Sequence, residues 1–218
     1  MTWLFYWLLF DVFLRYPYIV VTLVLLYYFR DRIPSPTAYF QRQKAFTRLK
    51  QEVAINPHDS TARRNLGFIL LEKNRPKEAL DNFLDALKKD DSAEINHFAG
   101  VAYLRSGMPD KAVEHLKKAI AMDPRFRLGE SYQWLGDAYN TLGRHEEALD
   151  TLKSCLSLNT TSIEGKYQYA RALKGLGKKD EAKKAAEEGI TFHRHNPRFL
   201  RRRDWRSYVR LKSLKRGL

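Results

Sequence analysis

The sequence predicts an all-α protein in which repeated helix pairs form a short solenoid between an apolar amino-terminal segment and a basic carboxy-terminal helix. Three observations support this prediction. Small residues recur at a regular spacing between residues 60 and 193, residues 2–29 are mostly apolar and aromatic, and residues 194–218 carry most of the net positive charge. A length of 218 residues suits one folded region with appendages.

The clearest helix pair lies in residues 129–162. Leu135 and Tyr139 are four residues apart, so they share one face of a first helix. Ala148 and Leu152 do the same on a second helix. Two helices of this size cannot bury their apolar faces alone, so further copies must stack on them.

Further copies of this pattern are present. The second-helix slot holds alanine in all four copies, at Ala79, Ala112, Ala148 and Ala182. The first-helix slot holds Gly67, Gly100, Gly136 and Ala170. The alanines are 33, 36 and 34 residues apart, so we expect extra residues near 126–128 and a longer entry to the third pair. Gly143 can take the left-handed conformation that ends the first helix of that pair.

This pattern resembles the tetratricopeptide repeat (TPR) family, whose period is about 34 residues. The family places an aromatic residue, Leu-Gly, Tyr and Ala at fixed offsets, and here these slots hold Tyr132, Leu135-Gly136, Tyr139 and Ala148. The resemblance covers roughly residues 60–193. It implies a solenoid of about four repeats.

Residues 1–33 are interpreted as a membrane anchor. The span Leu8–Leu26 has 19 residues, about 28 Å of helix, which is close to the thickness of a hydrocarbon core. Asp11 and Arg15 are four apart and can pair along the helix, and Pro17 is expected to kink it. A helical hairpin that turns at 15–17 and enters one leaflet remains an alternative.

The charges that flank this segment predict its orientation. Six Lys and Arg residues follow it within residues 30–50, and none precedes it apart from the amino terminus. The positive-inside rule then places the repeats in the cytoplasm. We therefore expect a single-pass membrane protein, in the inner membrane of a bacterium.

Residues 34–59 are expected to form a linker and a helix that caps the repeats. Ser35 or Thr37 can cap this helix, which should end near Ile55 because Asn56-Pro57 follows. Within the TPR resemblance, this segment looks like a half repeat.

Residues 194–218 form a basic tail. They contain ten Lys or Arg residues and one Asp, which is +9 of the chain's net +14. We expect Trp205, Tyr208 and Val209 to cover the end of the solenoid, as terminal helices do in repeat proteins. The cations expected to bind an anionic surface are Arg198, Arg201, Arg202, Arg203, Arg206 and Arg210.

The TPR resemblance implies a partner-binding groove along the inner face of the first helices. Carried over slot by slot, its residues are Arg64, Phe68, Leu71, His97, Val101, Leu104, Gln133, Asp137, Asn140, Tyr167, Arg171 and Lys174. The groove is expected to be apolar in the first two copies, polar in the third and basic in the fourth.

The sequence gives no sign of catalysis, a cofactor or a metal site. It contains no phosphate-binding loop, dinucleotide fingerprint or nucleophile elbow. Its one cysteine, Cys155, is interpreted as a small buried thiol, and His193 and His195 should point to different helix faces. We therefore expect a binding protein and not an enzyme.

Three functions remain open. The preferred one is a membrane-anchored TPR scaffold that holds a peptide or helix of a partner protein in the groove. The alternative is a membrane-tethered nucleic-acid or ribosome adaptor that acts through the basic tail. A third is an assembly factor of a membrane complex whose anchor contacts its partner through Asp11 and Arg15.

Overall fold

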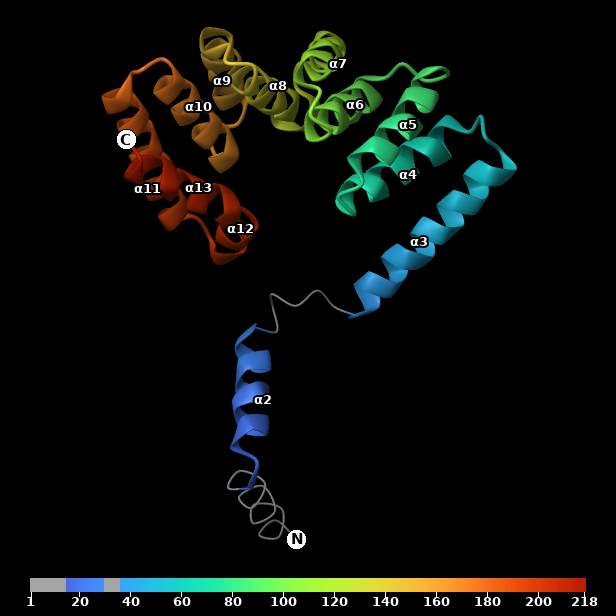
Figure 1. Cartoon of the computed structure of the whole chain (residues 1–218), viewed down its shortest axis with the longest axis horizontal. Helices are drawn as coiled ribbons and strands as arrows, with labels where there is room; N and C mark the ends of the chain where they lie inside the picture. Colours follow the sequence, from blue (N-terminus) through green and yellow to red (C-terminus); the bar gives the residue numbers. More distant parts are fainter. Residues whose placement is uncertain (1–14, 30–35) are drawn as a thin grey trace. The chain divides into compact units, whose positions relative to one another are not determined.

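The computed structural model describes residues 15–29 and 36–218, and within these ranges every regular element is a helix (Figure 1). The prediction of an all-α fold is therefore confirmed for the described residues. The chain divides into two compact units, Met1–Thr47 and Arg48–Leu218.

The amino-terminal segment is described from Arg15. Tyr16 is not helical and α2 spans Pro17–Phe29, so the expected kink at Pro17 is a break between helical residues. Along α2, apolar side chains such as Tyr18 (62%) and Val21 (57%) are exposed. In the described ranges, no helix combines the length and the apolar character that a membrane crossing requires. Part of the predicted span Leu8–Leu26, including Asp11, lies outside these ranges.

Helix α3 spans Pro36–Ile55 and ends directly before Asn56-Pro57, as the sequence predicts. Thr47, within α3, is the last residue of the first compact unit. The role of this helix as a cap for the repeats stays a prediction.

Four helix pairs follow one another around an arc between residues 60 and 195 (Figure 1). The pairs are α4 (Ser60–Glu72) with α5 (Pro76–Leu87), α6 (Ala93–Arg105) with α7 (Pro109–Met122), α8 (Glu130–Thr141) with α9 (His145–Leu158), and α10 (Ile163–Gly175) with α11 (Lys179–His195). Each first helix packs against its own second helix, and each second helix packs against the next first helix. This is the stacking that the repeat pattern requires.

Close contacts within each pair depend on the small residues of the first helix. A Cβ atom at Gly136 would lie 2.5 Å from Cγ of Leu152, and one at Gly100 would lie 2.6 Å from Cγ of Leu116. The four second-helix alanines of the repeat pattern are fully buried. The first helix of the third pair ends as predicted, because Gly143, with a φ of 75°, directly follows the C-cap residue Leu142.

The extra residues before the third pair form a short 3₁₀ turn, η1 (Phe126–Leu128). Its φ angles are 47° at Arg127 and 58° at Leu128, and Gly129 follows with 78°. Left-handed φ angles are uncommon for residues other than glycine, so this turn departs from regular repeat geometry. It confirms the longer connection before the third helix pair, which the interval of 36 residues between Ala112 and Ala148 predicts.

The basic tail folds as α12 (Arg198–Arg203) and α13 (Trp205–Arg216). Helix α13 packs against both α10 and α11, and Leu211 is fully buried among them (Figure 1). Tyr208 stacks on the ring of His193 with 4.2 Å between centroids.

The tail covers the end of the stack through a different face from the one expected. Tyr208 packs there as predicted, but Trp205 and Val209 are 54% and 48% exposed. The reason is helical spacing, because Tyr208, Leu211 and Leu214 lie three residues apart on the packed face.

Candidate functional site

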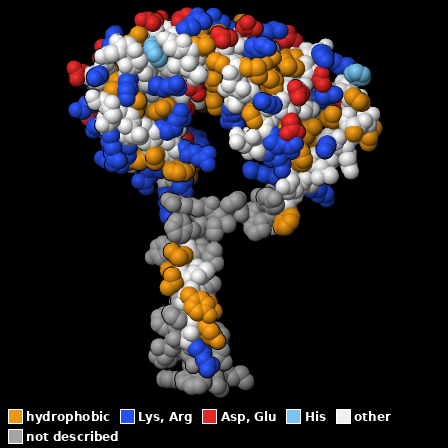
Figure 2. All heavy atoms as spheres, viewed as in Figure 1, with side chains coloured by type: hydrophobic (Ala, Val, Ile, Leu, Met, Phe, Trp, Pro, Cys, Tyr) orange, Lys and Arg blue, Asp and Glu red, His pale blue; other side chains and the backbone are white. Residues whose placement is uncertain are grey.

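The first helices of successive repeats lie next to one another and form what we call the inner face. Helix α4 contacts α6, α6 contacts α8, and α8 contacts α10. The space-filling view shows a hollow within the arc, with Lys and Arg side chains on both of its sides (Figure 2). Extended concave surfaces of this kind are the binding surfaces of repeat proteins.

Four of the predicted groove residues are buried and do not line this face. The exposed fractions are 7% for Leu71, 3% for Val101, 0% for His97 and 4% for Asn140. Neighbouring first helices pack closely enough to enclose these positions. Asn140, for example, donates from Nδ2 to the carbonyl oxygen of Gln168 in the next repeat, at 2.9 Å. Burial therefore leaves these four side chains little surface for direct contact with a partner, and their part in binding stays a prediction.

The other predicted groove residues remain half-buried or exposed, and several join consecutive repeats. Arg64 Nη1 lies 3.1 Å from a carboxylate oxygen of Glu94. Arg171 Nη1 lies 2.9 Å from Asp137 Oδ1, so the structure brings these two predicted residues together. Burial raises the pKa of Asp137 above its usual value, and Arg171 offsets part of this rise.

Apolar area remains accessible in the first two repeats. The ring of Phe68 packs edge-on against that of Phe98, with 4.2 Å between centroids, and is still half-buried. Leu104 is also half-buried. In the third repeat, Gln133 is half-buried and accepts a hydrogen bond from the Ser162 hydroxyl at 2.7 Å.

In the fourth repeat, α13 contacts two predicted groove residues. The guanidinium group of Arg210 lies 4.1 Å from the centroid of the Tyr167 ring. Lys174 Nζ donates to the carbonyl oxygen of Gly217 at 3.1 Å. The basic tail thus occupies part of the inner face that was expected to bind a partner.

A row of glutamates at the start of the first helices was missed. Glu94, Glu130 and Glu164 occupy the second position of their repeats, 36 and 34 residues apart, so the repeat spacing could have revealed them. Glu130 pairs with Arg127 at 2.8 Å. Glu164 accepts from the Ser207 hydroxyl at 2.7 Å and from Arg210 Nη1 at 2.9 Å. This row joins neighbouring repeats and attaches α13 to α10.

His97 is a buried polar residue between the second and third repeats. Its Nδ1 lies 2.8 Å from the Ser131 hydroxyl, and its Nε2 has no hydrogen-bond partner among the described residues. Burial, with a smaller contribution from Arg127, lowers the pKa of His97 to about 3. The imidazole is therefore neutral in the folded protein above that pH.

We expect His97 to make the stability of the fold depend on pH. Its ordinary pKa is 6.5 and its folded pKa is about 3, so between these values the unfolded chain binds a proton that the folded chain does not. Stability is then fully present above pH 6.5 and falls as the pH drops, by about 1.4 kcal/mol per pH unit. The wild-type protein should lose free energy of unfolding between pH 6.5 and 5. Chemical unfolding should show that this loss is smaller by about 2 kcal/mol in His97→Gln. Equal slopes for the wild-type protein and His97→Gln would contradict the assignment.

Six of the ten cations of the basic tail fall into two groups. Arg203 pairs with Asp204 at 2.8 Å, Arg210 with Glu164 at 2.9 Å, and Lys215 with Glu187 at 2.8 Å. These three hold the tail to itself or to the repeats. The exposed residues Arg198, Arg201 and Arg206 have no ion pair within the described part of the chain. Of the six cations predicted to bind an anionic surface, Arg203 and Arg210 are thus already paired.

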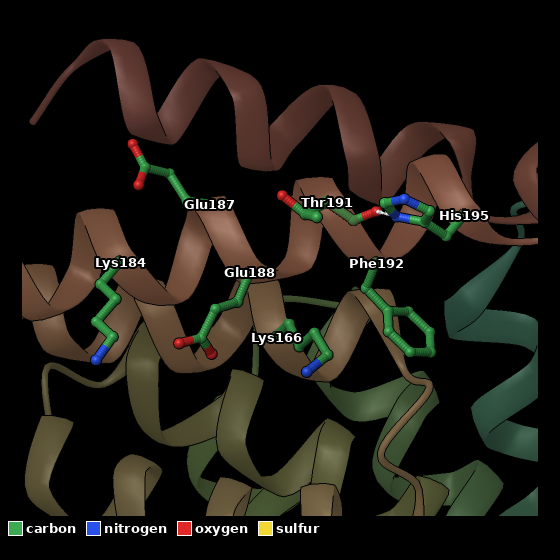
Figure 3. Close-up of a pocket in the computed structure, with 7 residues that line it drawn as sticks. All are labelled: Lys166, Lys184, Glu187, Glu188, Thr191, Phe192 and His195. Carbon is green, nitrogen blue, oxygen red and sulfur yellow. Dashed lines mark hydrogen bonds between the residues drawn. The ribbon is translucent and has the colours of Figure 1, made fainter.

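Two cavities lie near the fourth repeat. An open hollow of about 560 Å³ lies along α10 and α11, and its lining mixes Lys166 and Lys184 with Glu187 and Glu188 (Figure 3). The His195 imidazole in this hollow is hydrogen-bonded to the backbone of Thr191 (Figure 3). The charged side chains that line this hollow do not point to one common position (Figure 3).

The second cavity, of about 420 Å³, lies where α8 and α10 begin and where α12 meets α13. Its charged lining residues are Arg127, Glu130, Glu164, Arg203 and Asp204. Each of these residues already has an ionic partner.

The remaining polar side chains show no arrangement for metal binding. Across residues 15–29 and 36–218, no group of three or more His, Cys, Asp and Glu side chains could hold a metal ion. Cys155 is buried as predicted, and burial raises the pKa of its thiol to about 11. His193 is buried and His195 is exposed, which confirms that they point to different faces.

Comparisons with known proteins agree with this fold. The crystal structure of MamA is 21% identical, with a TM-score of 0.65, and the match covers 72% of this chain and 92% of that one. YrrB, described as a TPR protein with an unusual peptide-binding site, is 16% identical with a TM-score of 0.62, over 73% and 82% of the two chains. At these identities the likeness shows the fold alone.

One curated relative matches in sequence. Superkiller complex protein 3 of Homo sapiens is 36% identical over 84 residues, which are 38% of this chain and 5% of that protein. The match thus spans a small part of this relative.

Family models match three of the four helix pairs. One model described as a tetratricopeptide repeat matches residues 129–161 and 163–192, and a second with the same description matches residues 93–126. These segments are the second, third and fourth pairs of the arc. The helix pairs between residues 93 and 192 of this chain therefore match the tetratricopeptide repeat family.

Proposed function

We propose that this chain is a membrane-tethered scaffold that binds a partner protein along its inner face. The observation that carries the proposal is the row of adjacent first helices, which keeps accessible apolar and charged side chains on one side of the arc. An apolar partner helix held in a groove is a common mode of recognition. The peptide-binding site in the description of YrrB, a protein of the same fold, also supports it.

The burial pattern narrows the set of contact residues. Phe68 and Leu104 would receive apolar side chains of the partner, and Gln133 would offer a polar contact. Lys174 stays exposed and basic although its Nζ donates to the carbonyl oxygen of Gly217, and it would attract acidic groups on the partner. Leu71, His97, Val101 and Asn140 would support this surface from beneath.

The membrane tether is supported by the composition of α2. Residues 17–29 contain no charged residue, and exposed apolar side chains occur along the helix. A bilayer is the environment that accepts such a surface without cost. The cations of residues 30–50 favour a cytoplasmic location for the repeats.

Partner recovery tests the proposal. The chain is purified from gently solubilised membranes, and its partners are identified by mass spectrometry. We expect the double variant Leu104→Glu with Lys174→Glu to reduce recovery of the main partner at least about tenfold, because it places negative charge on the apolar and the basic part of the same face.

Two controls accompany this experiment. Met122→Glu adds a charge at an exposed apolar residue of α7, a second helix, and should leave recovery unchanged. Removal of residues 1–33 should make the chain extractable from the membrane fraction by high salt, because binding through basic residues is screened by salt and an inserted apolar segment is not. Unchanged recovery with the double variant would place the interface elsewhere, and a truncated chain that resists extraction by high salt would contradict the tether.

A further inference from the structure

Helices α12 and α13 expose arginines and large apolar side chains within residues 198–209. Phe199, Trp205 and Val209 are 69%, 54% and 48% exposed. Arg198, Arg201 and Arg206 are exposed beside them. We call these six residues the tail surface. Figure 2 shows hydrophobic and basic side chains together in the region of α12.

The side chains of the tail surface are not the ones that pack the tail against the repeats. That role belongs to the opposite face of α13, where Leu211 is fully buried and Tyr208 and Leu214 pack against the same cluster. Trp205 and Val209 are four residues apart, so they share the outward face of α13. Large exposed apolar side chains that do not stabilise the fold indicate an interaction surface.

The charge of this surface favours an anionic partner. Arg198, Arg201 and Arg206 have no ion pair with any described residue, whereas Arg203, Arg210 and Lys215 each have one. The free cations therefore lie next to the exposed apolar side chains. An amphipathic surface of this composition is typical of helices that lie at the interface of a bilayer.

We propose that the tail surface binds an anionic lipid bilayer. The three arginines contact the headgroups, while Phe199, Trp205 and Val209 enter the boundary between headgroups and acyl chains. Nucleic acid would attract the same arginines and stack on Trp205, but it offers no apolar phase for Val209. The exposed apolar side chains of α2 suit the same bilayer. This interaction goes beyond the proposed partner binding, because it uses neither the inner face nor a partner protein.

A fluorescent label on α13 tests this proposal in the full chain. Cys155→Ala removes the native thiol, and Ser213→Cys places an environment-sensitive dye at an exposed site on the face of Trp205 and Val209. The labelled protein is mixed with vesicles of phosphatidylcholine alone or with added phosphatidylserine. We expect a blue shift only with the anionic vesicles. Attachment through residues 1–29 does not produce this signal, because the dye reports on the tail itself.

Matched variants distinguish binding through the tail surface from binding through the net charge of the whole chain. Arg198→Gln with Arg201→Gln and Arg206→Gln should raise the lipid concentration needed for half of the shift about a hundredfold. The control set Lys77→Gln, Lys89→Gln and Arg125→Gln removes the same charge from exposed sites of the repeats and should leave that concentration unchanged. Phe199→Ser with Trp205→Ser should raise it about tenfold or more.

Four outcomes would overturn the proposal. They are an equal shift with neutral vesicles, an equal effect of both sets of Gln variants, no effect of the Phe199 and Trp205 variants, and loss of the shift when RNA is added at physiological salt. The last outcome would assign the surface to nucleic acid. Partner recovery through the inner face can succeed or fail independently of each of them.

Discussion

Replacing Leu211 with alanine is expected to lower the free energy of unfolding of the last repeat by about 2–5 kcal/mol. Leu211 is fully buried in a cluster with Ile163, Ala170, Ala186 and Ile190. Its Cδ1 lies only 2.9 Å from the position that a Cβ atom on Gly189 would take. Loss of the isobutyl group therefore leaves a cavity between three helices that cannot easily close.

The effect should stay local, because each repeat of a solenoid contacts only its neighbours. Hydrogen exchange should show loss of protection in α10, α11 and α13, while the amides of α4 to α7 keep theirs. Val209→Ala on the same helix is the control. Val209 is 48% exposed, so this variant should change stability by no more than about 0.5 kcal/mol. Equal losses of stability in both variants, or a loss of exchange protection in all repeats, would show that Leu211 does not attach α13 to the last repeat.

The repeat architecture could be predicted because its spacing follows from close contacts between backbones. A residue without a large side chain must stand wherever two helices touch, so Gly67, Gly100 and Gly136 recur at nearly equal intervals. The extra residues around Phe126 were visible for the same reason, since they lengthen one interval.

The accessible part of the candidate site could be predicted only in part. A repeat position assigned from the family pattern predicts the direction in which a side chain leaves its helix. It does not predict the distance to the next helix. His97 and Val101 point to the inner face and are then enclosed by neighbouring side chains. Phe126 of η1 contributes to this, with its ring 5.1 Å from that of His97, and η1 is a local departure from the family pattern.

The prediction for the tail was right for Tyr208 and wrong for Trp205 and Val209, because helical periodicity decides which side chains face the repeats. Tyr208, Leu211 and Leu214 define the packed face by their spacing, and Glu164 fixes its direction through Ser207 and Arg210. The contact with Glu164 joins residues more than forty positions apart, and no local pattern reveals such a pair. Because this face of α13 packs against the repeats, the side chains of the tail surface remain exposed.

Replacing Gly136 with leucine is expected to destabilise the third repeat by about 1–3 kcal/mol through overpacking. A Cβ atom at Gly136 would meet Cγ of Leu152 at 2.5 Å and its Cδ2 at 2.6 Å, and Leu152 is fully buried. The new side chain must therefore push α8 away from α9. Chemical unfolding of Thr141→Leu, at the exposed last residue of α8, provides the control and should give a change within about 0.5 kcal/mol.

A double-mutant cycle with smaller side chains shows whether this contact is the cause. Leu152→Ala alone should cost about 2–5 kcal/mol, because it empties the space above Gly136. Gly136→Ala should then stabilise the Leu152→Ala protein, since the methyl group fills part of the cavity and alanine favours a helix over glycine by about 1 kcal/mol. In the wild-type background the same change meets Leu152, so it should be neutral or destabilising. An identical effect of Gly136→Ala in both backgrounds would mean that the two residues are not coupled, and that close packing at this slot does not explain the recurring glycine.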